Sequence, residues 1–223
     1  MALPVRRREV GRDQYLVREG EEPQTCCLLF EGFAYRHKVT GDGSRQIISI
    51  HLPGEFVDLQ NALLGAADHN VQTLTRAEVA LIQQAALQEL IARYPAIGRA
   101  MWIDTLIDSS IFREWVVNVG RRDAQSRVAH LLCELLMRMK AAGLTANEGY
   151  DLPLTQAQLA DATGLTSVHV NRVLKALREA GLISLDVRSL RILDLKGLRS
   201  AGDFNELYLH HQLEALEASA VSA

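Results

Sequence analysis

The hydrophobic pattern of this 223-residue chain changes its period once, close to residue 87. Up to about residue 90, short runs of β-branched and aromatic residues are separated by turns rich in glycine and aspartate. Beyond Leu87, apolar residues recur every three to four positions, as they do on the buried face of an α-helix. Strands followed by helices predict an α+β protein, and the length is typical of two unequal domains.

The first half has the spacing of a small antiparallel β-structure. Gly-Asp-Gly at 41–43 separates two β-type runs and is a strong hairpin signal. Many short strands at this spacing, from residue 13 onward, predict a β-roll or jelly roll. The segment 56–65 has a helical pattern instead and ends at Gly65, so we expect a short helix inserted between strands.

A long helix is expected over residues 96–120, directly after Pro95 ends a shorter helix. Its apolar residues cover too wide an arc for a single buried stripe. Such a helix needs two partners, and we expect these to be its own β-roll and a second copy of the chain. The side chains expected at this dimer interface are Met101, Ile103, Ile107, Ile111 and Trp115.

The segment 155–180 reads as two helices joined by a tight turn. Thr155 and Gln158 have the spacing of a capping box, Gly164 permits a sharp turn, and Thr166 is placed as the N-cap of the second helix. This is the arrangement of a helix-turn-helix, whose second helix enters the DNA major groove. Residues 182–195 then predict a β-hairpin, which would form a wing.

The exposed positions of this motif have the chemistry that DNA recognition needs. Arg172 can pair with both acceptors of a guanine, and Asn171 or Ser167 can bond a base edge or a phosphate. Thr155 and Gln156 stand at a helix N-terminus, where free N–H groups and the helix dipole favour a phosphate. The residues expected to contact DNA are Thr155, Gln156, Thr166, Ser167, Val168, His169, Asn171, Arg172, Lys175 and Arg188.

These features, in this order, resemble the Crp/Fnr family of bacterial transcription regulators. The resemblance rests on "LPGEF" at 52–56 in the roll, the long helix, "RVAHLL" at 127–132 and the helix pair at 154–183, and it extends over residues 13–208. It implies a homodimer that binds a two-fold symmetric DNA site, senses a signal through the roll and contacts RNA polymerase. The expected domains are a sensor roll (1–95), a dimerisation helix (96–120), a winged helix-turn-helix (121–208) and a tail (209–223).

Three departures from the family pattern matter. Family members usually begin with a helical segment, whereas here the roll is expected to start near Tyr15. Many members carry a glutamate at the position of Val168, so the DNA half-site should differ. In the expected effector pocket (Gly54, Glu55, Asp68, His69), Gly54 and Glu55 match the ribose-binding pair, but the phosphate-binding arginine is missing near Asp68, whose charge would repel a phosphate. Cyclic AMP is therefore not expected to bind.

Other functions find little support in the residue types. Cys26, Cys27 and Cys133 cannot supply the four thiolates of an iron–sulfur cluster, and haem has only weak support from scattered roll histidines. No cofactor, metal site or catalytic residue is predicted. Two alternatives stay open: a ligand-binding β-roll module, which would leave the helix pair unexplained, and a cupin-like metal enzyme, which would need clustered histidines.

The remaining expectations concern charge and location. The net charge is −3, but residues 151–201 contain seven Lys or Arg against five Asp or Glu, a modest local excess of the sign that DNA attracts. No apolar run reaches the roughly 18 residues of a membrane span, and the N-terminus has no signal-peptide pattern. We therefore expect a cytoplasmic protein.

Overall fold

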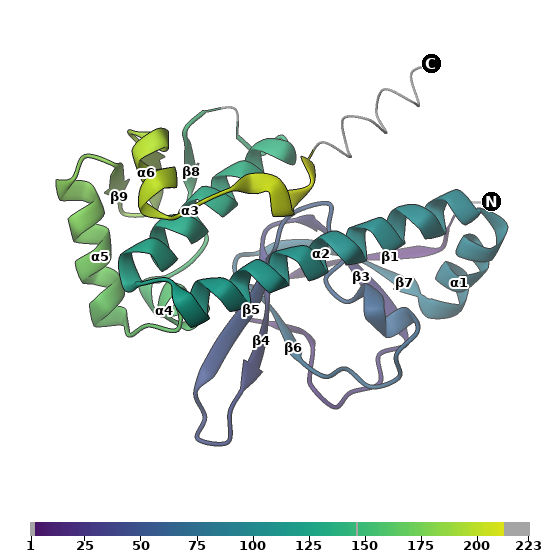
Figure 1. Ribbon diagram of the computed structural model, residues 1–223. Helices are drawn as coiled ribbons and strands as arrows, with labels where there is room; N and C mark the ends of the chain where they lie inside the picture. Colours follow the sequence, from purple (N-terminus) through teal and green to yellow (C-terminus); the bar gives the residue numbers. More distant parts are fainter. Residues whose placement is uncertain (1–2, 146, 212–223) are drawn as a thin grey trace, which may run out of the picture. The chain divides into compact units, whose positions relative to one another are not determined.

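The computed structural model describes residues 3–145 and 147–211, which form two compact units connected by a shared long helix (Figure 1). The first unit comprises residues up to 105 together with 153–164, and the second comprises residues 106–152 and those from 165 onward. Each unit is described by itself below. None of the helices in the described ranges has the length and apolar character needed to cross a membrane. The expected tail lies outside the described residues from position 212 onward.

The first unit contains the predicted roll, built from two antiparallel sheets. Its core side chains, among them Val17, Leu29, Val57, Val71 and Val79, are buried. One sheet has the order β1-β7-β3, with bounds Val5–Val10, Ala77–Gln83 and Thr25–Glu31. The other has the order β2-β6-β4-β5, with bounds Tyr15–Val17, Asn70–Thr73, Ala34–Val39 and Arg45–His51. The hairpin predicted at Gly-Asp-Gly is the β4–β5 hairpin, so that prediction is confirmed.

Two expectations about the roll were wrong in their limits. The roll begins at Val5 rather than near Tyr15, because strand β1 pairs with β7 from Val5 to Val10. This edge strand exposes three consecutive arginines and has no alternating apolar pattern, so its sequence gave no strand signal. The helix expected over 56–65 is a single 3-10 turn, η1 (Leu59–Ala62), whose N-cap residue makes no side-chain capping bond.

Helix α1 (Gln84–Arg93) and the first part of α2 (Pro95–Arg121) complete the roll unit. Leu87 of α1 is fully buried in a cluster that Ile91 and Met101 pack against. Gly98 permits the close approach of the two helices, since a Cβ there would lie 2.7 Å from the Ile91 side chain. Helix α2 follows as the predicted uninterrupted helix, and its second part belongs to the other unit.

The second unit is built around α3 (Ala124–Ala141), whose N-cap is Asp123. The carboxylate of Asp123 accepts a hydrogen bond from the Ser126 N–H at 2.9 Å. The core stripe of α3 is formed by Val128, Leu131, Leu132, Leu135, Leu136 and Met139, which are all buried. The other elements are α5 (Ser167–Glu179), α6 (Leu195–Ala201), η2 (Glu206–Leu209) and a sheet of order β8-β10-β9, with bounds Gly149–Asp151, Ser189–Ile192 and Ile183–Asp186.

A fully buried carboxylate, Glu134 of α3, connects three segments of this unit. The indole N–H of Trp115 on α2 donates to both of its oxygens, at 3.1 and 3.0 Å. The Tyr208 hydroxyl donates to Glu134 at 2.9 Å, and the Arg138 guanidinium donates at 3.3 Å. Burying a carboxylate is costly unless donors surround it, and these three partners provide that environment. The network joins α2, α3 and the segment after α6.

Gly202 follows α6 at its closest approach to α3, and we expect Gly202→Ala to destabilise the second unit. A Cβ at this position would lie 2.7 Å from the backbone nitrogen of His130 and 3.0 Å from the Ala129 carbonyl carbon. Because backbone atoms cannot shift aside cheaply, we expect a loss of about 1–3 kcal/mol in the free energy of unfolding. Urea denaturation followed by circular dichroism measures this loss.

The matched control is Gly120→Ala in helix α2, where a Cβ would meet nothing within 4 Å. Alanine in a helix should raise the free energy of unfolding there by about 0.5–1 kcal/mol. If Gly202→Ala were as stable as the parent protein, the close packing of α6 against α3 would be contradicted.

Candidate nucleic-acid interface

Helix α5 is the predicted recognition helix, and its start is defined by a capping contact. The hydroxyl of Thr166 accepts a hydrogen bond from the His169 N–H at 3.3 Å, which confirms Thr166 as the N-cap. The side chains of Val170, Val173, Leu174 and Leu177 form the buried stripe of α5. This stripe fixes which side of α5 faces the unit's core and which side faces solvent.

The solvent face of α5 presents the residues expected to contact DNA. Arg172 and Asn171 are exposed in the middle of the helix. Within the described residues, no carboxylate lies at ion-pair distance from Arg172, whereas Lys175 is 3.6 Å from Glu179. The guanidinium of Arg172 is therefore available to an outside partner. Also exposed are Thr166, Ser167, Val168, His169 and Lys175.

Helix α4 (Gln156–Thr163) has the predicted capping box. The Gln158 N–H donates to the Thr155 hydroxyl at 3.2 Å, and the Thr155 N–H donates to the Gln158 side chain at 2.9 Å. Gly164 ends the helix with φ of 63°, a left-handed conformation that glycine adopts without strain. Thr155 and Gln156 are exposed at the helix N-terminus, as phosphate contacts require.

The other end of α4 packs on strand β5 within the first unit. The guanidinium of Arg45 binds the carboxylate of Asp161, with nitrogen–oxygen distances of 2.7 and 2.8 Å. Arg45 also donates to the Tyr35 hydroxyl at 2.9 Å, and that hydroxyl donates to Gln72 at 2.7 Å. The charge of Asp161 is thus neutralised by an arginine of the roll.

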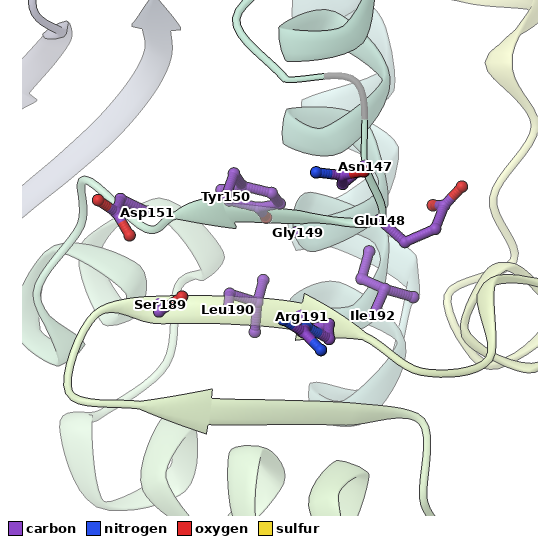
Figure 2. A pocket seen from close by; sticks show the side chains of 9 residues that line it. All are labelled: Asn147, Glu148, Gly149, Tyr150, Asp151, Ser189, Leu190, Arg191 and Ile192. Atoms are coloured by element: carbon purple, nitrogen blue, oxygen red, sulfur yellow. The ribbon is translucent and has the colours of Figure 1, made fainter.

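The predicted wing is the β9–β10 hairpin, with Val187 and Arg188 at its turn. Strand β8 adds a third strand through pairing with β10, which the polar composition of residues 144–153 had not indicated. Figure 2 shows a shallow hollow along β8 and β10, with Asp151 and Glu148 at opposite ends of β8. Arg188 at the exposed turn stays a predicted contact to the DNA backbone.

The expected effector residues lie on two separate turns of the roll. Gly54 has φ of 95°, and its N–H donates to the Leu29 carbonyl at 2.7 Å. The carboxylate of Glu55 accepts from the Leu52 N–H at 3.3 Å and lies 3.4 Å from the His51 ring. Glu55 therefore has partners within its own turn, as expected for a residue that stabilises the turn.

Asp68 and His69 form a pair of their own. Their side chains are 2.5 Å apart, and the Asp68 carboxylate is 85% exposed, so it faces solvent rather than the roll interior. His69 is buried, its other ring nitrogen lies 3.1 Å from the Gln60 amide, and its pKa is lowered by burial and by the charge of Arg36. Among the described residues, no three His, Cys, Asp or Glu side chains are grouped as a metal site.

The predicted dimer residues of α2 divide into two groups. Met101, Ile103 and Ile107 are half-buried, but Ile111 and Trp115 are buried within their own chain. Trp115 is held by Glu134, so neither buried side chain offers much surface to a second copy. The place of these residues in a dimer interface stays a prediction. The large apolar side chains of α2 most exposed to solvent are Trp102, Leu106, Phe112, Val116 and Val117.

The comparisons with known proteins agree with this architecture. Residues 7–94 match the cyclic nucleotide-binding domain, and residues 126–201 match the Crp-like helix-turn-helix domain. The chain is 29% identical over 195 residues to the transcriptional activator protein FnrL of Cereibacter sphaeroides, covering 85% of this chain and 78% of that protein. It is 27% identical over 193 residues to the nitrogen fixation regulation protein FixK of Rhizobium meliloti, covering 85% and 83%.

A solved structure has the same fold. The structure of FixK2 from Bradyrhizobium japonicum superposes with a TM-score of 0.80 at 22% identity, covering 89% of this chain and 98% of that one. A roll, a long helix and a winged helix-turn-helix matched in this order define a DNA-binding transcription regulator. The chain belongs to the Crp/Fnr family, which confirms the resemblance seen in its sequence.

The buried carboxyl of Asp58 in the roll gives a pH-dependent prediction. It is 1% exposed and accepts a hydrogen bond from the Cys27 N–H at 2.6 Å. Burial raises its pKa from 3.8 to about 7, against the opposing effect of that hydrogen bond and of Arg36. Between these values the folded state keeps a proton that the unfolded state has lost, so this group's contribution to stability falls as pH rises from about 4 to 7.

Asp58→Asn should remove this contribution while keeping an oxygen for the Cys27 N–H. Urea unfolding at pH 4.5 and pH 7.5 measures the difference, and the parent protein should lose more stability than the variant over this interval. If the free energies of unfolding of the two proteins changed equally with pH, Asp58 would have its ordinary pKa in the folded state, which would contradict the prediction.

Proposed function

We propose that this regulator is a homodimer that reads a two-fold symmetric DNA site with helix α5. The observation that carries the proposal is the solvent face of α5, where Arg172 and Asn171 are exposed on a capped helix with a buried opposite face. The second helix of a helix-turn-helix lies in the major groove with its N-terminal residues against base edges. The exposed half of α5 has the residue types for that position.

Each contact has a defined chemical role in this proposal. Arg172 pairs with the O6 and N7 acceptors of a guanine, and Asn171 suits an adenine. Thr155 and Gln156 hold a phosphate at the N-terminus of α4, where the backbone N–H groups are positioned by the capping box. Phosphate contacts fix the register, and the base contacts of α5 supply the sequence preference.

The dimer in this proposal uses the exposed apolar face of α2. Trp102 is 68% exposed, and Leu106 follows it one helical turn later. Phe112 and Val116, again four positions apart, are also exposed. Trp102 also borders an apolar groove of about 550 Å³ that includes Leu63, Leu64 and Ile91. The stripe and the groove are continuous through Trp102, so the occupant we propose is helix α2 of a second copy.

The roll is proposed as the receiver of a signal other than cyclic AMP. The side chain at the expected phosphate position, Asp68, is an exposed carboxylate, and its charge disfavours a cyclic phosphate. The family relationship makes RNA polymerase the partner that responds to DNA binding, with the cytoplasm as the site of action. The protein acts by binding, and no reaction is assigned to it.

Arg172→Ala should abolish preference at one base pair of each half-site. Losing a bidentate contact to guanine should weaken binding to the site with guanine by about 1–3 kcal/mol. Binding to sites with another base at that position should not change. Fluorescence anisotropy on DNA selected from a random library, with single substitutions at every position, measures this preference. The control is Arg6→Ala on strand β1, an exposed arginine of the roll that should leave binding unchanged. Equal preference in Arg172→Ala and the parent would overturn the assignment of α5.

Leu106→Asp should convert the dimer into a monomer, because it places a charge in the proposed apolar interface. Sedimentation equilibrium measures the change in association. The matched control is Leu144→Asp, at an exposed leucine beyond α3 that lies away from α2 in the sequence. A Leu106→Asp protein that stays fully dimeric would exclude this face of α2 as the interface.

A further inference from the structure

The solvent face of α5 contains one large apolar side chain. Val168, in the first turn, is 61% exposed, whereas the other valines of the helix, Val170 and Val173, are buried. A β-branched residue has only modest helix propensity, and one so exposed gains little from burial. Single exposed apolar residues are common on protein surfaces, so the argument depends on where this one lies.

Val168 lies on the same exposed face as Arg172, one helical turn earlier. The two residues are separated by four positions, and both face away from the buried stripe. If Arg172 reaches a base edge, Val168 reaches the same groove. It is also closer to the helix N-terminus, the end that enters the major groove in this motif.

The chemistry of the groove allows one specific partner for such a side chain. The base edges in the major groove present hydrogen-bond donors and acceptors, and the only apolar group among them is the thymine methyl. Cytosine is recognised through a carboxylate, but the single acidic residue of α5 is Glu179, near its far end beside Lys175. The first turn of α5 therefore has no group that selects cytosine and one group that selects a methyl.

We propose that Val168 reads the methyl group of one thymine in each DNA half-site. This inference rests on the proposed function of α5 as the recognition helix. Four residues of α-helix span about 6 Å, and successive bases on one strand are about 3.4 Å apart. The thymine therefore lies within about two base pairs of the guanine that Arg172 contacts.

The test replaces thymine by deoxyuridine, which pairs identically but lacks the methyl group. Each thymine of the selected site is replaced singly, and the Kd is measured by fluorescence anisotropy at fixed salt. Removing one buried methyl should weaken binding by about four-fold at one thymine in each half-site. Replacement at the other thymines should have little effect.

The variant Val168→Ala separates a direct contact from an effect on DNA shape. It should bind the thymine site more weakly than the parent and should no longer distinguish thymine from deoxyuridine at the sensitive position. The control Val39→Ala changes an exposed valine of the roll and should keep the full discrimination. Neither substitution removes a buried side chain, so both proteins should fold.

The outcomes are distinct. If the parent and Val168→Ala lose the same affinity on methyl removal, or if no thymine within two base pairs of the guanine is sensitive, the inference about Val168 is overturned. If no specific site is selected at all, or if selection does not depend on Arg172, the proposed function of α5 fails instead.

Discussion

The buried carboxylate of Glu134 is the interaction on which the second unit depends. It is fully enclosed, and its partners are Arg138, one turn away on the same helix, and two residues distant in the sequence, Trp115 on α2 and Tyr208 beyond α6. Removing one donor would leave a buried charge undersatisfied, which is among the more costly changes in a protein core. The network therefore holds the end of the long helix in one arrangement on α3.

This arrangement determines which faces of the helices are left for partners. Because Glu134 binds Trp115, that side of α2 is turned toward α3, and the opposite side, with Leu106 and Val117, is left to solvent. On α5, the buried stripe fixes the exposed position of Arg172 in the same way. The proposed dimer and DNA contacts thus both depend on which faces of α2 and α5 are buried inside one chain.

Local rules were sufficient to predict the helix-turn-helix. Thr155 and Thr166 cap helices where their sequence positions indicated, because a capping bond involves residues only a few positions apart. Strands β1 and β8 were missed for the opposite reason. Each is specified by its pairing partner, β7 or β10, and an arginine-rich edge strand has no apolar alternation of its own.

The packing of α2 on its own chain could not be read from the sequence for a similar reason. Both sides of the helix are apolar, so periodicity cannot tell which side packs on the same chain. The choice depends on a buried carboxylate nineteen positions away, and a glutamate in an amphipathic helix looks like a surface residue in the sequence. The Arg45–Asp161 ion pair joins residues 116 positions apart, so no local sequence pattern predicts it either.

The most direct test of the central claim is methylation interference at guanine N7 on the selected DNA site. A methyl group on N7 blocks the bidentate contact of an arginine in the major groove. The account predicts interference at one guanine in each half-site, the two being related by two-fold symmetry, and loss of both signals with Arg172→Ala. Interference at no guanine, or an unchanged pattern in the variant, would contradict DNA reading by helix α5.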